Sequence, residues 1–136
     1  MKYTALVDAA KKAKRHAHAP YSNFRVGAAV LTKSGEIITG CNIENSSYSL
    51  TMCAERTAIF KAMSESKTAF TALAIVSDDP ELITPCGACR QVILDLAGNI
   101  DIILTTKNGN IKILKMNKLL PYPFTGRSLE QFKKEK

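Results

Sequence analysis

Two short cysteine segments, far apart along the chain, constrain how this sequence can fold. The first segment contains Cys53, and the second contains Cys86 and Cys89. Three cysteine thiolates can hold one Zn²⁺ and leave its fourth position open, which is typical of catalytic zinc sites. A structural site completed by an unrecognised fourth ligand is the alternative. Either kind of site requires a fold that brings the two segments together.

Both cysteine segments are predicted to open helices. Thr51 is a suitable N-cap for a helix over residues 52–63, and a second helix is predicted over residues 87–97. Helix N-termini are electropositive, which favours the thiolate form of cysteine. We therefore expect two helix N-termini to meet at the metal.

Glu55 follows the first cysteine by two residues. In mid-helix, side chains two positions apart diverge, but in the first turn Cys53 and Glu55 can both approach one metal. A carboxylate beside a catalytic zinc that is not a ligand is predicted to carry protons, whereas a structural site needs no such group. The next residue, Arg56, is either a donor to a ligand sulfur or an ordinary exposed helix arginine.

The rest of the chain alternates between predicted helices and strands. Helices are predicted over residues 3–18 and 129–134, and strands over residues 26–31, 37–43, 71–77, 100–105 and 111–114. Asn108-Gly109 between the last two strands is a strong hairpin signal, so those strands should be antiparallel. Helices join strands 2 to 3 and 3 to 4, which implies parallel crossovers. The predicted fold is therefore α/β, with a mixed five-stranded sheet and helices on both faces.

Length and composition indicate one soluble domain over residues 1–136. Apolar residues make up 46% of the chain and charged residues 23%, which is ordinary for a globular protein. The N-terminus lacks the apolar core of a signal peptide, and no apolar run approaches the roughly 18 residues of a membrane helix. We therefore expect a cytoplasmic protein with no membrane partner.

The net charge of +7 includes basic runs at residues 11–15 and 133–136. Such runs are typical either of nucleic-acid contacts or of solvated helix faces. No aromatic side chains for base stacking are interleaved with them, so we favour solvated faces and expect no nucleic-acid partner.

Three residues around the end of the second predicted strand also carry polar or thiol groups. Cys41 is expected to be a small buried hydrophobe rather than a metal ligand. Asn42 and Glu44 are either binding groups at a strand end or plain turn residues.

Four stretches of the chain match a known family. They are YSNFRVGAA at residues 21–29, GCNIEN at 40–45, CAER at 53–56 and PCGACRQ at 85–91. On these stretches the chain resembles the small bacterial-type, homotetrameric, zinc-dependent cytidine deaminases. The resemblance implies their three-layer fold. It also implies hydrolytic deamination of cytidine and deoxycytidine to uridine and deoxyuridine plus ammonia, in pyrimidine salvage.

The resemblance also implies roles for the cysteines and for the glutamate. Cys53, Cys86 and Cys89 would hold one Zn²⁺ per subunit, and water activated by the zinc would attack C4 of the pyrimidine. Glu55 would take a proton from that water and pass it to the pyrimidine N3, and then to the departing ammonia.

The substrate contacts are implied in the same way. Phe24 would pack on the pyrimidine, the backbone of Ala54 would contact the base, and Asn42 and Glu44 would hold the ribose 3′-hydroxyl. In a homotetramer, neighbouring subunits would complete each site, with Phe124 covering a neighbour's substrate and Tyr48 near the ribose at the subunit boundary.

Two other functions compete with this one. A deaminase of tRNA or single-stranded DNA is supported only by the charge, and its fifth strand would run parallel after a helix rather than in a hairpin. Glu44 would also repel a 3′-phosphate. A zinc-stabilised binding module without catalysis is the other alternative, and Glu55 argues against it.

Overall fold

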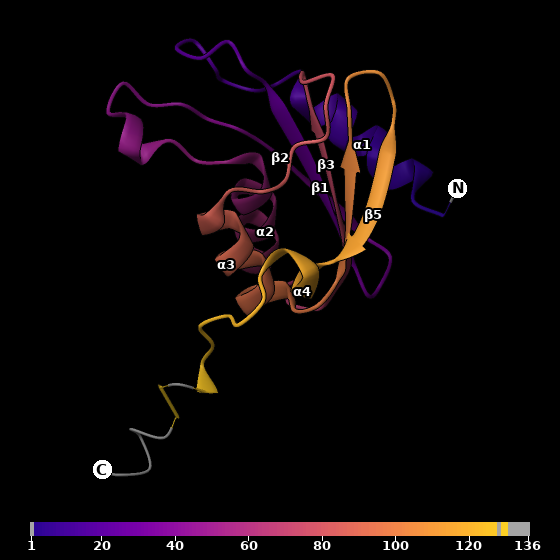
Figure 1. Cartoon of the computed structure of the whole chain (residues 1–136), viewed down its shortest axis with the longest axis vertical. Coiled ribbons are helices and arrows are strands. Elements are labelled where there is room, and N and C mark those ends of the chain that lie inside the picture. The colour runs from indigo at the N-terminus through magenta and orange to yellow at the C-terminus, as the bar shows by residue number, and fades with distance from the viewer. Residues whose placement is uncertain (1, 128, 131–136) are drawn as a thin grey trace.

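The structure is a computed structural model that describes residues 2–127 and 129–130. Its elements, in chain order, are α1 (Thr4–Lys14), β1 (Val26–Thr32), β2 (Ile37–Cys41), the 3₁₀ helix η1 (Tyr48–Leu50), α2 (Ala54–Ser64), β3 (Phe70–Ser77), α3 (Gly87–Ala97), β4 (Asp101–Thr105), β5 (Ile111–Lys115) and α4 (Met116–Leu119). The strands form one sheet, and the helices lie on its two faces (Figure 1).

The sheet has the order β2-β1-β3-β4-β5. β3 and β4 are parallel, and the other neighbouring pairs are antiparallel. β2 and β3 therefore run in the same direction with β1 between them, as the predicted crossover requires. The hairpin between β4 and β5 is also confirmed, and Gly109 in its turn has a φ of 88° that favours glycine.

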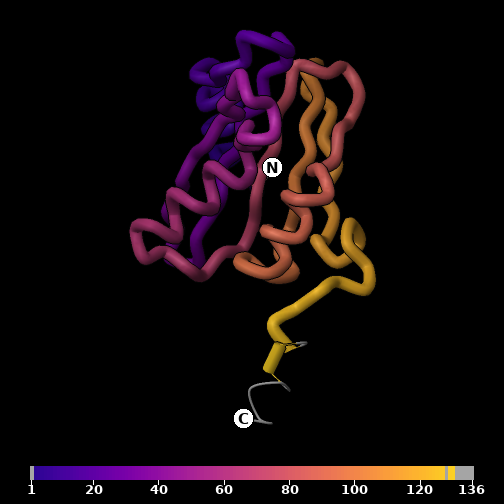
Figure 2. The backbone as a smooth tube through the Cα atoms, turned by 90° about the vertical axis from the view of Figure 1, so that its left-hand side faces the viewer, coloured from indigo at the N-terminus to yellow at the C-terminus, as the bar shows by residue number. Residues whose placement is uncertain are grey.

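The two faces of the sheet pack against different helices. On β3, Leu73 and Ile75 belong to the core beneath α2 and α3, whereas Ala72, Ala74 and Val76 pack towards α1. This alternation follows from the two-residue repeat of a strand, and burial on both faces explains the nearly continuous apolar run of β3. Figure 2 shows α2 and α3 side by side over their face of the sheet. The predicted three-layer arrangement is therefore confirmed.

Gly40 in β2 allows α2 to lie directly against the sheet. A Cβ atom at position 40 would lie 2.5 Å from the backbone nitrogen of Ala58 and 2.6 Å from the backbone oxygen of Ala54. Gly27 plays the same part for α1, because a Cβ there would lie 2.1 Å from the backbone oxygen of Ala10. These contacts fix both helices at backbone distance from β1 and β2.

Gly40→Ala is therefore expected to lower the free energy of unfolding by about 1–3 kcal/mol, the usual cost of overpacking. Urea denaturation measures the difference. Gly126→Ala is the control, because nothing lies within 4 Å of a Cβ at that position. Equal stability of the Gly40 variant and the wild type would show that α2 does not rest on this glycine.

The predicted start of the second helix was wrong. α2 begins at Ala54 with Cys53 as its N-cap, not at residue 52 with Thr51 as the cap. The reason is that Met52 pairs with Ile43 through two backbone hydrogen bonds of 2.9 Å, which holds Met52 in an extended conformation. Cys53 is therefore the N-cap of α2 and Glu55 lies in its first turn, where both side chains can reach one metal.

The other element boundaries differ by a few residues. α1 ends at Lys14 rather than at residue 18, because the backbone of His18 bonds to Asn42 and Glu44 instead of continuing the helix. The short helix α4 was not predicted. The predicted helix over residues 129–134 falls mostly outside the described residues. Residues 121–127 lead away from the sheet and helices (Figures 1 and 2).

Within the described residues, no helix combines the length and the apolar character needed to cross a membrane.

Candidate active site

The fold brings the two cysteine segments together at adjacent helix N-termini. Cys53 caps α2, Cys86 caps α3, and Cys89 lies in the first turn of α3. Their sulfur atoms all lie within 4.8 Å of one another, and the Cys53 and Cys86 sulfurs are 3.9 Å apart. In residues 2–127 and 129–130, no other group of three histidine, cysteine or carboxylate side chains converges in this way. Cys41 lies outside the cluster, as predicted.

The donor set fits zinc. Three thiols that converge on one point suit Zn²⁺, which binds sulfur in tetrahedral geometry. Cys53 and Cys86 also line a cavity of about 220 Å³. The cysteine cluster therefore opens onto a space that can admit a small molecule, as a catalytic site requires.

The thiols of Cys53 and Cys89 differ in how readily they lose a proton. The hydrogen bond from the Cys89 thiol, together with the Arg56 guanidinium, lowers the pKa of Cys53 to about 5 despite partial burial. The same bond, with burial, raises the pKa of Cys89. A metal that binds all three sulfurs therefore has to displace the proton that Cys89 retains.

Arg56 donates to the cluster rather than to solvent. Its Nη2 atom lies 3.4 Å from the Cys53 sulfur. Its Nε atom is buried and has no hydrogen-bond partner in the described part of the chain. A guanidinium in this position offsets the negative charge that three thiolates would place on a divalent metal.

Arg56→Ala is therefore expected to lower zinc affinity and activity by about 10- to 100-fold, the usual effect of losing such a partner of a metal ligand. Competition with a zinc chelator and steady-state kinetics measure the two effects. Arg56→Lys is the control, because it retains the charge and should lose less. Kinetics and zinc affinity that both match the wild type would return Arg56 to the role of a surface arginine.

Glu55 is buried next to the cysteines. Only 5% of its surface is exposed, and it lines the same cavity as Cys53 and Cys86. Burial raises its pKa to about 7, and the nearby Cys53 thiolate acts in the same direction. A carboxyl group with such a pKa can both accept and donate a proton near neutral pH.

The cavity also contains several of the predicted substrate-binding residues. Its remaining lining is formed by Phe24, Val26, Asn42, Thr51, Ala54, Ile83 and Thr84. Sequence reasoning missed Thr51, Ile83 and Thr84 as lining residues. The last two belong to a loop that carries no motif. That loop is held by Arg90, which donates to the Thr84 hydroxyl at 2.6 Å and to the Pro85 carbonyl at 2.8 Å.

Asn42 and Glu44 hold the loop that precedes β1. Asn42 accepts from the Val26 backbone N–H at 2.9 Å and donates to the Phe24 carbonyl at 2.8 Å. Glu44 accepts from the backbone N–H groups of Tyr21 and Ser22, at 3.0 and 3.1 Å, and from the Ser22 hydroxyl. The Ser22 hydroxyl bond is the main reason that the pKa of Glu44 is lowered. Both residues therefore position Phe24 against the cavity.

Three of the predicted substrate-binding residues, Glu44, Tyr48 and Phe124, do not line the cavity of the single chain. Tyr48 is 60% exposed, and Phe124 is 61% exposed. The Phe124 carbonyl accepts from the Gln91 amide at 2.8 Å, which ties the start of the outlying C-terminal segment to α3. Neither aromatic ring lines the cavity that contains Glu55.

An open three-cysteine site, with a buried carboxylate at the same helix N-terminus, defines a zinc-dependent hydrolase of the deaminase class. A family model described as the cytidine and deoxycytidylate deaminase zinc-binding region matches residues 1–105. The chain belongs to this family, and the cofactor of its site is Zn²⁺.

Individual relatives agree along nearly the whole chain. A cytidine deaminase of Sporosarcina psychrophila is 50% identical over 125 residues, which is 91% of this chain and 92% of the relative. A cytidine deaminase of Halalkalibacterium halodurans is 46% identical over 125 residues, 91% of this chain and 95% of the relative. The crystal structure of cytidine deaminase from Burkholderia pseudomallei superposes with a TM-score of 0.88 at 45% identity, and the match covers 91% of this chain and all of that one.

Proposed function

We propose that this protein is a cytidine deaminase that converts free cytidine and deoxycytidine to uridine and deoxyuridine plus ammonia. The observation that carries the proposal is the buried carboxylate of Glu55, which lines one cavity with Cys53 and Cys86, two of the three converging cysteines. The bacterial relatives named cytidine deaminase support the choice of substrate. We place this reaction in pyrimidine salvage and expect it in the cytoplasm.

Each part of the site has a separate task. Cys53, Cys86 and Cys89 hold the zinc, which when bound supplies the Lewis acidity that activates water at neutral pH. Glu55 accepts a proton from the attacking water and transfers it to N3 of the pyrimidine as oxygen adds to C4. The proton of the hydroxyl group that is now on C4 then passes through Glu55 to the amino group, which leaves as ammonia while the C4 carbonyl of uridine forms.

The cavity gives the nucleoside a defined orientation. Phe24 and Ala54 both line the cavity, and in this proposal the Phe24 ring packs against the pyrimidine and the backbone of Ala54 contacts the base. Asn42 and Glu44 bind the ribose 3′-hydroxyl. Glu44 already accepts three hydrogen bonds. An ionised carboxylate has about four acceptor positions, so one remains for the hydroxyl.

The active form in this proposal is a homotetramer. Tyr48 and Phe124 carry large exposed apolar surfaces and do not reach the cavity of their own chain, and Leu50 nearby is 66% exposed. Tyr48 and Leu50 lie together on η1, and contiguous exposed apolar groups are typical of interfaces. In the assembly, Phe124 covers a neighbour's substrate and Tyr48 lies near a neighbour's ribose.

Free nucleosides, rather than polynucleotides, are the substrates in this proposal. A carboxylate against the 3′-hydroxyl repels a 3′-phosphate, which every internal nucleotide carries. The β4–β5 hairpin supports the same choice. A deaminase of tRNA or single-stranded DNA would instead have a helix between these strands and a parallel fifth strand.

An ultraviolet assay with matched substrates tests this selectivity. Cytidine and deoxycytidine are expected to be turned over, while cytidine 3′-monophosphate and internal cytidines of a single-stranded oligonucleotide are not. Cytidine 5′-monophosphate is the control for phosphate charge alone. Efficient editing of the oligonucleotide would overturn the proposed substrate class and leave the zinc chemistry intact.

A further inference from the structure

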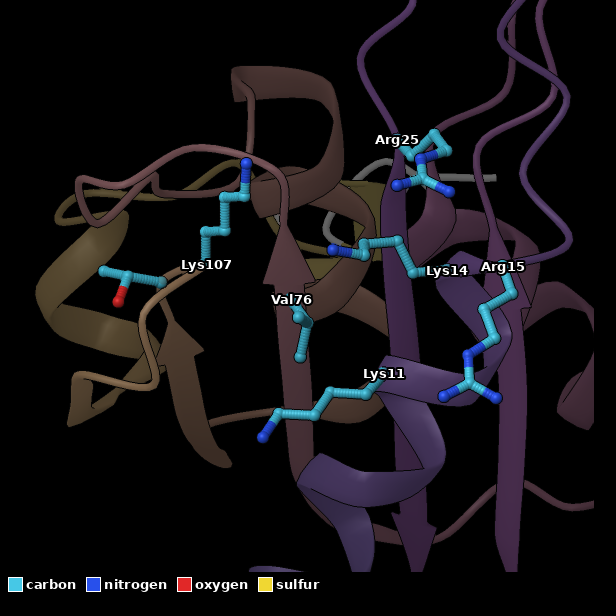
Figure 3. Close-up of a pocket in the computed structure, with 7 residues that line it drawn as sticks. Lys11, Lys14, Arg15, Arg25, Val76 and Lys107 are labelled. Atoms are coloured by element: carbon cyan, nitrogen blue, oxygen red, sulfur yellow. The ribbon is translucent and has the colours of Figure 1, made fainter.

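A second cavity, of about 330 Å³, lies on the α1 face of the sheet, opposite the face that carries α2 and α3. It is lined by Lys11 and Lys14 of α1, Arg15 just after α1, Arg25 before β1, Val76 of β3, and Thr106 and Lys107 after β4. Figure 3 shows Lys11 and Lys14 extending from α1 across Val76, towards the side on which Lys107 stands. Cations from three separate parts of the chain therefore surround one hollow.

The charges in this cavity are only partly compensated. Asp78 pairs with Lys14 at 2.8 Å and with Arg25 at 3.0 Å. Across residues 2–127 and 129–130, Lys11, Arg15 and Lys107 form no ion pair. The five cations that line the cavity and the Asp78 carboxylate that pairs with two of them carry a net charge of +4. Like charges at close quarters repel unless an anion lies between them.

We propose that this cavity binds a small molecule that carries a diphosphate or triphosphate group. Lysine and arginine are donors only, and both form strong charge-assisted hydrogen bonds with phosphate oxygens. Lys11 and Lys107 approach from opposite walls, so a chain of phosphate groups matches their arrangement better than a single phosphate does. A hollow of this volume accommodates such a group.

A polynucleotide fits the cavity less well. Single-stranded nucleic acids are bound by basic grooves that also present aromatic side chains to the bases. None of the lining residues is aromatic, and Val76 is the one apolar side chain among them. The cavity therefore recognises phosphate without a platform for bases.

Calorimetric titration of the zinc-loaded protein with inorganic pyrophosphate tests the proposal at physiological ionic strength. Lys11→Met combined with Lys107→Met removes two unpaired cations from opposite walls and retains side chains of similar length. Lys12→Met combined with Lys112→Met is the matched control, because both lysines are exposed and lie outside the cavity lining. Zinc content is measured before and after titration, since pyrophosphate also chelates metals.

The first pair is expected to weaken pyrophosphate binding by about tenfold or more, in line with the loss of charge-assisted hydrogen bonds, and the control pair by less than about twofold. Inorganic phosphate should bind the wild type more weakly than pyrophosphate. Undetectable pyrophosphate binding to the wild type, or equal weakening in both pairs, would overturn the proposal. Tighter binding of a short single-stranded RNA, lost equally in both pairs, would identify a nucleic-acid surface instead.

Discussion

Glu55→Gln should retain its zinc, and its kcat for cytidine should fall by about 10²–10⁴-fold, the range typical of a general acid–base group. Glutamine has nearly the size of glutamate, so the buried position, which is only 5% exposed, remains filled. The three sulfurs that converge on the metal are unchanged. The amide cannot accept a proton from water or return one to the departing ammonia, so the chemical step loses its proton carrier. Metal analysis and steady-state kinetics on the same sample separate binding from turnover.

Glu65→Gln provides the matched control, because Glu65 lies just past the opposite end of α2 and bonds to Lys67 at the surface. Its kinetics should match those of the wild type. A Glu55→Gln variant with full zinc and near-native kcat would remove Glu55 from the role of proton carrier.

Cys86→Ala should lose its zinc and, with it, measurable deamination. Two cysteines remain, which is one fewer protein ligand than catalytic zinc sites normally provide. Cys86 also accepts a hydrogen bond from the Cys89 backbone at the N-terminus of α3, so the first turn of that helix is weakened as well. Because metal binding contributes to folding free energy, the unfolding midpoint should fall towards that of the zinc-free wild type.

Cys41→Ala is the control for this experiment, since Cys41 is a free cysteine outside the converging group. It should keep about one zinc per chain, the content of an intact site of this kind. Full zinc in the Cys86 variant, or loss of zinc in the Cys41 variant, would show that the ligand set contains different cysteines.

The regular elements were predictable because their signals are local. The helix over residues 87–97 was predicted with the bounds that α3 has in the structure. The apolar run of β3 and the Asn108-Gly109 turn also identified their elements, since burial on both faces and a tight turn leave clear patterns. The metal cluster joins segments that are far apart in sequence, and it was predicted because Cys53, Glu55, Cys86 and Cys89 match the pattern of zinc deaminases.

The start of α2 depended on a contact that no local pattern encodes. Thr51 is a better N-cap by composition than Cys53. The pairing of Met52 with Ile43 prevents the helix from starting earlier, and it forms only after the chain has folded back. The Thr51 hydroxyl accepts from the Asn45 backbone at 3.2 Å instead of capping the helix.

The polar contacts around the site could not be predicted from the sequence, because they too join residues that are distant in the chain. The sequence left Asn42 as either a ligand-binding residue or a turn residue. In the structure its side-chain amide bonds to the backbone of Phe24 and of Val26. The cationic cavity likewise joins residues that are distant in sequence, since Lys11 and Lys107 line it together only in the folded chain. The basic run at residues 11–15 alone indicated no more than a charged helix face.

The proposed function is tested most directly by incubating the purified protein, at a measured zinc content, with cytidine and quantifying the products by chromatography and an ammonia assay. The account predicts uridine and ammonia in equal amounts, at a rate that rises with zinc content and falls about 10²–10⁴-fold in Glu55→Gln. Cytidine that remains unchanged in the presence of fully zinc-loaded wild-type protein would contradict it.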